Sequence, residues 1–193
     1  MTTGPLSLTD WAPRGDARDH GGVRVTTWTI DVRDPDDDEA RAAVRAYSAE
    51  LDELLGASSP TIADPDTGAY RAPRGTFLVV MDGREVSGCA ALRVIDVPPH
   101  GPVAEVKRMW VSRRLRGHGV GRALLERLHA DARGRGLGYV VLDSRRELLD
   151  ARRLYLAAGY RDIEPYGDNA DANVWMGMSL TDPGPAGPEA SPG

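Results

Sequence analysis

Apolar and polar positions follow two different rhythms along this chain, and each rhythm predicts one kind of secondary structure. Short runs of β-branched and other apolar residues predict strands, at residues 23–32, 76–81, 85–95, 103–111, 138–143, 159–164 and 173–180. Apolar residues recur at helical spacing in 40–54, 119–133 and 148–158, which predicts three helices. The order of these elements predicts an α/β domain, a mixed and strongly twisted sheet with helices on both faces.

Local signals refine the ends of these elements. Asp82-Gly83 favours a hairpin turn between two strands, and Asp34-Pro35-Asp36 is a good start for the first helix. The acidic run 36–39 suits the positive end of that helix. Ser144-x-x-Glu147 has the form of a capping box for the third helix. Residues 97–102, with three prolines, are expected to form a stiff connection.

The chain is expected to hold one domain, at residues 23–180. Residues 1–22 mix Gly, Pro, Asp and Arg without periodicity and are expected to be poorly ordered. Residues 181–193 are rich in Pro and Gly, as expected of a flexible tail. The long Pro/Gly/Asp segment 57–75 is expected to be a functional loop, because loops of that length inside a compact domain often are.

Composition narrows the class of protein. Hydrophobic residues make up 41% and charged residues 27%, as in soluble globular proteins, and neither a membrane span nor a signal peptide is evident. The single cysteine, Cys89, fits a reducing compartment, so a cytoplasmic location is expected. A net charge of −5 argues against a nucleic-acid partner. No pair of the four histidines has convincing metal-ligand spacing, so no metal is expected.

The most informative segment is Arg-Gly-His-Gly-Val-Gly at 116–121, between a predicted strand and a predicted helix. Free backbone N–H groups and the helix dipole make such a turn a site for phosphate, and glycines allow an anion to approach closely. A Walker loop would need Gly-Lys-Ser/Thr, whereas Gly121 precedes Arg122-Ala123. The glycine spacing also differs from that of a dinucleotide fingerprint.

The segment instead matches Arg/Gln-x-x-Gly-x-Gly/Ala, the pyrophosphate loop of the GNAT N-acetyltransferase family. Residues 105–111, Glu-Val-Lys-Arg-Met-Trp-Val, are similar to the family's fourth strand. Residues 151–160, which end in Leu-Tyr-x-x-x-Gly-Tyr, are similar to its late helix. On these three blocks the chain resembles the family from about Val23 to Leu180. The resemblance implies a twisted, mostly antiparallel sheet of six to seven strands flanked by helices, with splayed central strands.

The resemblance also implies acetyl-CoA as the cosubstrate. The pantetheine arm of the coenzyme is then expected along the fourth strand, like an added strand, with a backbone N–H facing the thioester oxygen. The residues so implied are Met109, Trp110 and Val111 on the strand and Arg116, Gly117, His118, Gly119, Val120, Gly121 and Arg122 in the loop. Six cations and no acid lie between Lys107 and Arg122. They are expected to serve the coenzyme phosphates, although a solvated basic loop is the alternative.

Two residues are candidates for proton transfer. Glu105 is the candidate general base, and its alternative role is to pair with Lys107 on the same face of the strand. Tyr155 matches the family's tyrosine and is the candidate general acid for the departing thiolate; its alternative role is core packing. Relatives often carry an Asn seven positions before this tyrosine, but this chain has Leu148, which puts that coenzyme contact in doubt.

The predicted reaction is direct acetyl transfer in a ternary complex to a primary amine, expected to belong to a small molecule. Trp110 and Trp175 are candidate core residues, and Trp175 together with Tyr166 is alternatively expected to line the acceptor side. Acids in segments expected to border the acceptor mildly favour a cationic amine; they are residues 34–39, Asp64, Asp66, Asp168 and Asp171. The alternatives are a protein lysine or N-terminal acetyltransferase and a silent acyl-CoA sensor. The oligomeric state stays open, a homodimer being one option.

Overall fold

The computed structural model describes residues 27–56 and 67–181. These residues form a seven-stranded sheet of order β1-β2-β3-β4-β5-β7-β6. The strands are β1 (Trp28–Val32), β2 (Gly75–Asp82), β3 (Glu85–Val97), β4 (Gly101–Val111), β5 (Tyr139–Ser144), β6 (Arg161–Asp162) and β7 (Val174–Ser179). The helices are α1 (Asp38–Leu55), α2 (Val120–Gly134) and α3 (Leu149–Ala158), with short 3-10 helices η1 (Thr67–Tyr70) and η2 (Arg113–Leu115). Only β4 and β5 pair in parallel, so the predicted mostly antiparallel sheet with flanking helices is confirmed.

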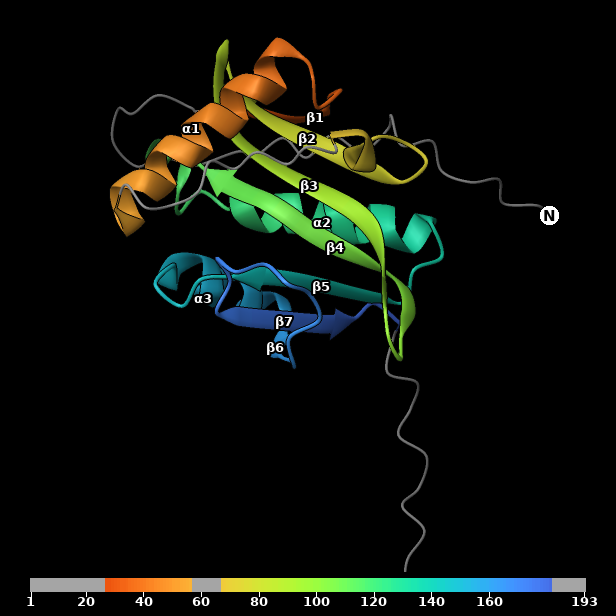
Figure 1. Ribbon diagram of the computed structural model, residues 1–193. Helices are drawn as coiled ribbons and strands as arrows, with labels where there is room; N and C mark the ends of the chain where they lie inside the picture. The colour runs from red at the N-terminus through yellow and green to blue at the C-terminus, as the bar shows by residue number, and fades with distance from the viewer. Residues whose placement is uncertain (1–26, 57–66, 182–193) are drawn as a thin grey trace, which may run out of the picture.

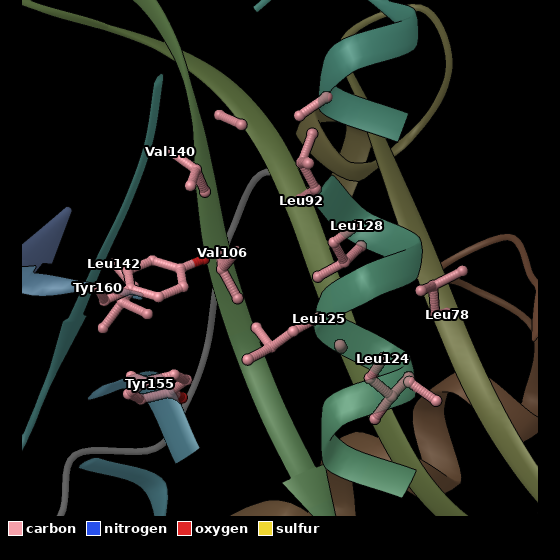
Figure 2. Close-up of a cluster of buried hydrophobic side chains, with 14 of the residues drawn as sticks. Leu78, Leu92, Val106, Leu124, Leu125, Leu128, Val140, Leu142, Tyr155 and Tyr160 are labelled. Carbon is pink, nitrogen blue, oxygen red and sulfur yellow. The ribbon is translucent and has the colours of Figure 1, made fainter. Parts of the chain in front are cut away.

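The sheet separates two apolar layers, because alternate residues of a strand point to opposite faces. Figure 1 shows α1 in front of the sheet and α2 behind it. Behind the sheet, α2 packs Leu124, Leu125 and Leu128 onto strand residues such as Leu92 and Val106 (Figure 2). All five are at most 2% exposed, and full burial of such a side chain contributes roughly 2 kcal/mol.

The front face carries two smaller apolar clusters. Ala40 and Ala43 of α1 pack with residues of β2 and β3 in one of them. The other lies at the far end of the same face, where Tyr166 packs against Val103 and Val141. The front face between these clusters is polar, and it is described below as the candidate acceptor side.

The pairing between β4 and β5 is short. It covers Ala104–Val106 of β4 and Val140–Leu142 of β5. Beyond these pairs β4 continues through Val111 and β5 through Ser144, and the two strands diverge toward their C-terminal ends (Figure 1). The splayed central strands implied by the family resemblance are therefore present.

A β-bulge lies at the start of the diverging part of β4. Ala91 of β3 pairs with Lys107, but Cys89 pairs with Trp110, so two steps on β3 oppose three on β4. Arg108, within this step, has φ of 55°, and its carbonyl accepts a hydrogen bond from Cys89 Sγ at 3.2 Å. The extra residue shifts the alternation of β4, so Trp110 lies on the front face with Lys107.

Several predicted boundaries differ from the structure. β3 and β4 extend to Val97 and Gly101, so the stiff connection is shorter than predicted, and β6 has two residues. The prediction of a capping box was wrong. The residue that precedes α3 is Leu148, and no side chain of the described residues caps this helix. Ser144 instead ends β5 opposite Val174, and Glu147 accepts a hydrogen bond from Asn173. Ser144 thus takes part in sheet pairing, and Glu147 contacts a loop residue. The segments 1–22 and 182–193 lie outside the described residues.

Candidate active site

The glycine loop and the start of α2 present an exposed row of backbone donors. The N–H groups of residues 119–122 donate to no acceptor in the described part of the chain. Gly117 and Gly119 both have φ of 78°, a conformation that favours glycine, and a Cβ at either residue would meet no atom within 4 Å. The loop therefore combines open space with free donors at a helix N-terminus, which suits a pyrophosphate group.

Gly121 differs from the other two glycines. A Cβ there would lie 3.0 Å from Leu154 Cδ2 of α3. Its small size therefore allows α2 and α3 to pack closely, in addition to any role beside the coenzyme.

The cations near this loop are largely engaged within the protein. Arg113 Nη2 lies 2.7 Å from Glu53, and Arg114 Nη2 lies 2.8 Å from Asp82. Arg116 donates to a Glu50 carboxylate oxygen and, at 3.0 Å, to the carbonyl of Val111. Backbone donors are therefore the stronger candidates for phosphate binding, together with Arg122, whose side chain is 79% exposed and, among the described residues, forms an ion pair only with Glu126.

Glu50 of α1 holds the end of β4 against the loop. It accepts a hydrogen bond from Trp110 Nε1 at 2.8 Å as well as the one from Arg116. Burial alone would raise the pKa of the Glu50 carboxyl, but these two hydrogen bonds and the charges of Arg116 and Arg113 together lower it. Met109 and Val111 pack toward the opposite layer. The three strand residues implied to bind the coenzyme thus lie where β4 has no pairing with β5.

Glu105 lies in the polar part of the front face and is only 2% exposed. Its Oε2 accepts a hydrogen bond from Arg93 Nε at 2.5 Å, and its Oε1 accepts one from Tyr166 OH at 3.1 Å. Lys107 Nζ is farther away, at 3.8 Å from Oε1. The main partners of Glu105 are therefore Arg93 and Tyr166, while Lys107 is a secondary one.

Asp143 of β5 is the second carboxylate of this face. Lys107 Nζ donates to its Oδ1 at 2.6 Å, and Asn169 Nδ2 donates to its Oδ2 at 2.7 Å. Trp175 pairs with Asp143 across the strands, and its buried Nε1 has no hydrogen-bond partner within the described residues. Tyr166 and Trp175 thus both belong to this face, and their role in an acceptor wall stays a prediction.

We refer to Arg93, Glu105, Lys107 and Asp143 as the polar strip. Sequence reasoning missed the contributions of Arg93 and Asp143. Residues 91, 93 and 95 of β3 share one face, and Arg93 pairs with Glu105 of β4. Both facts are needed to place Arg93 beside Glu105.

Tyr155 lies in the rear layer, at the edge of the main core next to Tyr160 and Leu142 (Figure 2). It is 5% exposed. Burial raises the pKa of its phenol, and Tyr47 of α1 and Asp143 add to this effect. The phenol stays protonated at neutral pH and can donate a proton.

The acids expected at the acceptor side are only partly there. Arg71 binds both Asp34 and Asp36, and its hydrogen bond to Asp34 lowers the pKa of that carboxyl to about 2. Asp34 and Arg71 border a separate hollow of about 340 Å³ against the C-terminal half of α2, whose lining does not include Glu105 or Tyr155. Asp64 and Asp66 lie outside the described residues, and Asp168 and Asp171 are exposed in the loop before β7.

Two features are missing from residues 27–56 and 67–181. These residues contain no group of three or more His, Cys, Asp or Glu side chains arranged to hold a metal ion. None of their helices combines the length and the apolar character needed to cross a membrane.

Comparison with known proteins agrees with this geometry. Residues 23–160 match the acetyltransferase (GNAT) family. The chain is 35% identical over 127 residues to an "IAA acetyltransferase" of Azospirillum brasilense, covering 65% of this chain and 81% of that protein. It is 32% identical over 148 residues to an uncharacterized N-acetyltransferase of Schizosaccharomyces pombe, covering 74% and 88%.

Solved structures share the fold. A GNAT-family acetyltransferase of Staphylococcus aureus superimposes with a TM-score of 0.65 at 15% identity, covering 79% of this chain and 99% of that one. The GNAT domain of PAT from S. lividans superimposes with a TM-score of 0.63 at 22% identity, covering 89% and 98%. The protein belongs to the GNAT family and is an acyltransferase.

Proposed function

We propose that this enzyme transfers an acetyl group from acetyl-CoA to a primary amine of a small molecule, directly and within a ternary complex. One observation carries the proposal. Glu105, in the middle of the three residue pairs that join β4 to β5, lies on the front face, and Tyr155 lies behind the sheet next to Leu142 of the last pair (Figure 2). A thioester held between the strands would then have a base on one side and an acid on the other.

The reaction follows from this arrangement. The loop at 117–122 binds the pyrophosphate, and free N–H groups of β4 bind the pantetheine arm and the thioester oxygen. The ammonium form of the acceptor loses one proton toward Glu105, the resulting amine attacks the thioester carbonyl, and the nitrogen of the tetrahedral intermediate releases a second proton to solvent. The tetrahedral intermediate collapses, the C–S bond breaks, and the CoA thiolate takes a proton from Tyr155. Solvent then restores both side chains.

The substitution Glu105→Gln tests the role of the base. It keeps the shape of the side chain and removes its ability to accept a proton, so kcat should fall by about 10²-fold while the affinity for acetyl-CoA stays unchanged. An alkylamine has a pKa near 10, so more of it is free at pH 9.5 and the loss should shrink there. Asp143→Asn, which removes the other carboxylate of the polar strip, serves as the control. An equal loss at pH 7 and pH 9.5 would show that Glu105 does not remove protons.

The acceptor is identified by a screen for CoA release with alkylamines, polyamines, amino acids, aminoglycosides and lysine-containing peptides. Turnover with a small amine supports the proposal, and turnover with peptides alone supports a protein acceptor. Calorimetric binding of acetyl-CoA without any turnover would identify a sensor.

A further inference from the structure

The loop between β6 and β7 covers both carboxylates of the polar strip. Tyr166 donates to Glu105 at 3.1 Å, and Asn169 donates to Asp143 at 2.7 Å. On its other oxygen, Glu105 receives Arg93 at 2.5 Å. Since the Glu105 side chain is 3% exposed, an amine that enters from the front has almost no direct access to it.

The phenol of Tyr166 is the group through which a proton can reach Glu105. It is hydrogen-bonded to the carboxylate, and its ring packs against an apolar cluster that includes Val103 and Val141. Burial, followed by the negative charge of Glu105, raises the pKa of the phenol. It therefore carries its proton at neutral pH and presents its oxygen as an acceptor.

We propose that Tyr166 relays the proton from the acceptor amine to Glu105. The ammonium N–H bond breaks as its proton passes to the Tyr166 oxygen, and the Tyr166 O–H bond breaks as that proton passes to Glu105 Oε1. The net change is ammonium to amine and carboxylate to carboxylic acid, with Tyr166 unchanged. This inference rests on the proposed function, because it requires Glu105 to be the base.

The relay also restricts the acceptor. The amine must bring its nitrogen to the phenol oxygen of Tyr166 while facing the opening between β4 and β5. An unhindered primary amine meets this demand better than a secondary or branched one.

The test compares Tyr166→Phe with Asn169→Ala. The first keeps the ring and its packing and removes only the hydroxyl. The second removes the matching contact from the same loop to Asp143. With the best amine of the screen, Tyr166→Phe should lower kcat at pH 7 by roughly 10- to 100-fold, with little change in KM. The loss should shrink at pH 9.5, and Asn169→Ala should show no such pH-dependent loss.

A double variant separates the relay from a structural role. If Tyr166 and Glu105 lie on one proton path, Glu105→Gln/Tyr166→Phe should be no slower than Glu105→Gln alone, because groups that act as a unit are not additive. Independent losses that multiply would overturn the relay, as would a Tyr166→Phe loss that is equal at both pH values.

The other outcomes are distinct. Full or increased turnover of Tyr166→Phe beside an impaired Glu105→Gln overturns the relay and leaves the proposed base in place. An active Glu105→Gln, or a screen in which no amine is acetylated, overturns the proposed function and the relay with it.

Discussion

At the scale of single residues, the structure turns sequence candidates into groups with defined neighbours. Glu105 and Tyr155 keep their proposed roles, and each now has a partner that changes how it is tested. For Tyr155, burial raises the pKa of the phenol, and smaller electrostatic contributions from Tyr47 and Asp143 raise it further. A neutral phenol can act as a general acid, and this role matters only at pH values where the departing thiolate needs a proton.

The substitution Tyr155→Phe should therefore lower turnover most at low pH. A thiol resembling free cysteine has a pKa near 8.5, so above that value the thiolate can leave without a proton and the difference from wild type should narrow. The ring remains, so the melting temperature and the affinity for acetyl-CoA should change little. Steady-state kinetics and calorimetry on the one variant check this. A destabilised but fully active Tyr155→Phe would leave Tyr155 with a packing role alone.

At the scale of elements, local patterns predicted most of the secondary structure but not its exceptions. The hairpin at Gly83, the three helices and the order of the strands along the chain follow from periodicity and turn chemistry. The bulge at Arg108 does not, because regular alternation from Lys107 would place Met109, not Trp110, on the front face. One inserted residue reverses every later side chain of a strand, and no local signal marks Arg108.

The sequence likewise predicted some parts of the candidate site and missed others. The glycine loop and Tyr155 lie in contiguous motifs, whereas the polar strip joins residues from three strands. The pairing of Arg93 with Glu105 depends on the register of β3 with β4, which a single sequence does not specify. The basic run was expected to serve phosphates, but α1 and the β2–β3 hairpin supply acids to Arg113, Arg114 and Arg116.

The loop itself is best tested at Gly119, because Gly121 also packs α3. Gly119→Asp and Gly119→Asn place side chains of nearly equal size in open space, at a φ of 78° that both residues tolerate better than most. Only the aspartate adds a negative charge beside the pyrophosphate. Gly119→Asp should bind acetyl-CoA at least 10-fold more weakly than Gly119→Asn, measured by calorimetry. Equal affinities of the two folded variants would place the pyrophosphate elsewhere.

At the scale of the whole molecule, a buried histidine links stability to pH. His129 of α2 is 6% exposed, and its Nε2 lies 2.8 Å from the hydroxyl of Tyr160. Burial, with a smaller contribution from Arg133, lowers the pKa of His129 from 6.5 to about 4. The folded state thus binds this proton less readily than the unfolded state. The stabilisation is complete above about pH 6.5 and is lost as the pH falls through 6.5 toward 4.

The substitution His129→Gln keeps a polar group that can reach Tyr160 and removes the titration. It should be less stable than wild type at pH 7, and the gap in free energy of unfolding should narrow by up to about 3 kcal/mol by pH 4. Urea unfolding at pH 7, 5.5 and 4 measures this gap. A gap that is constant across the three pH values would contradict the assignment.

The short pairing of β4 with β5 has a mechanical meaning for the whole sheet. Three residue pairs, between 104–106 of β4 and 140–142 of β5, join a part of the sheet with four strands to a part with three. Few strand pairs hold this junction, and the rear apolar layer, which draws residues from both parts of the sheet, supports it. A coenzyme arm bonded along the free edge of β4 would add hydrogen bonds to the part of β4 that does not pair with β5. On the binding mode proposed above, bound acetyl-CoA would therefore also help to hold the two parts of the sheet together.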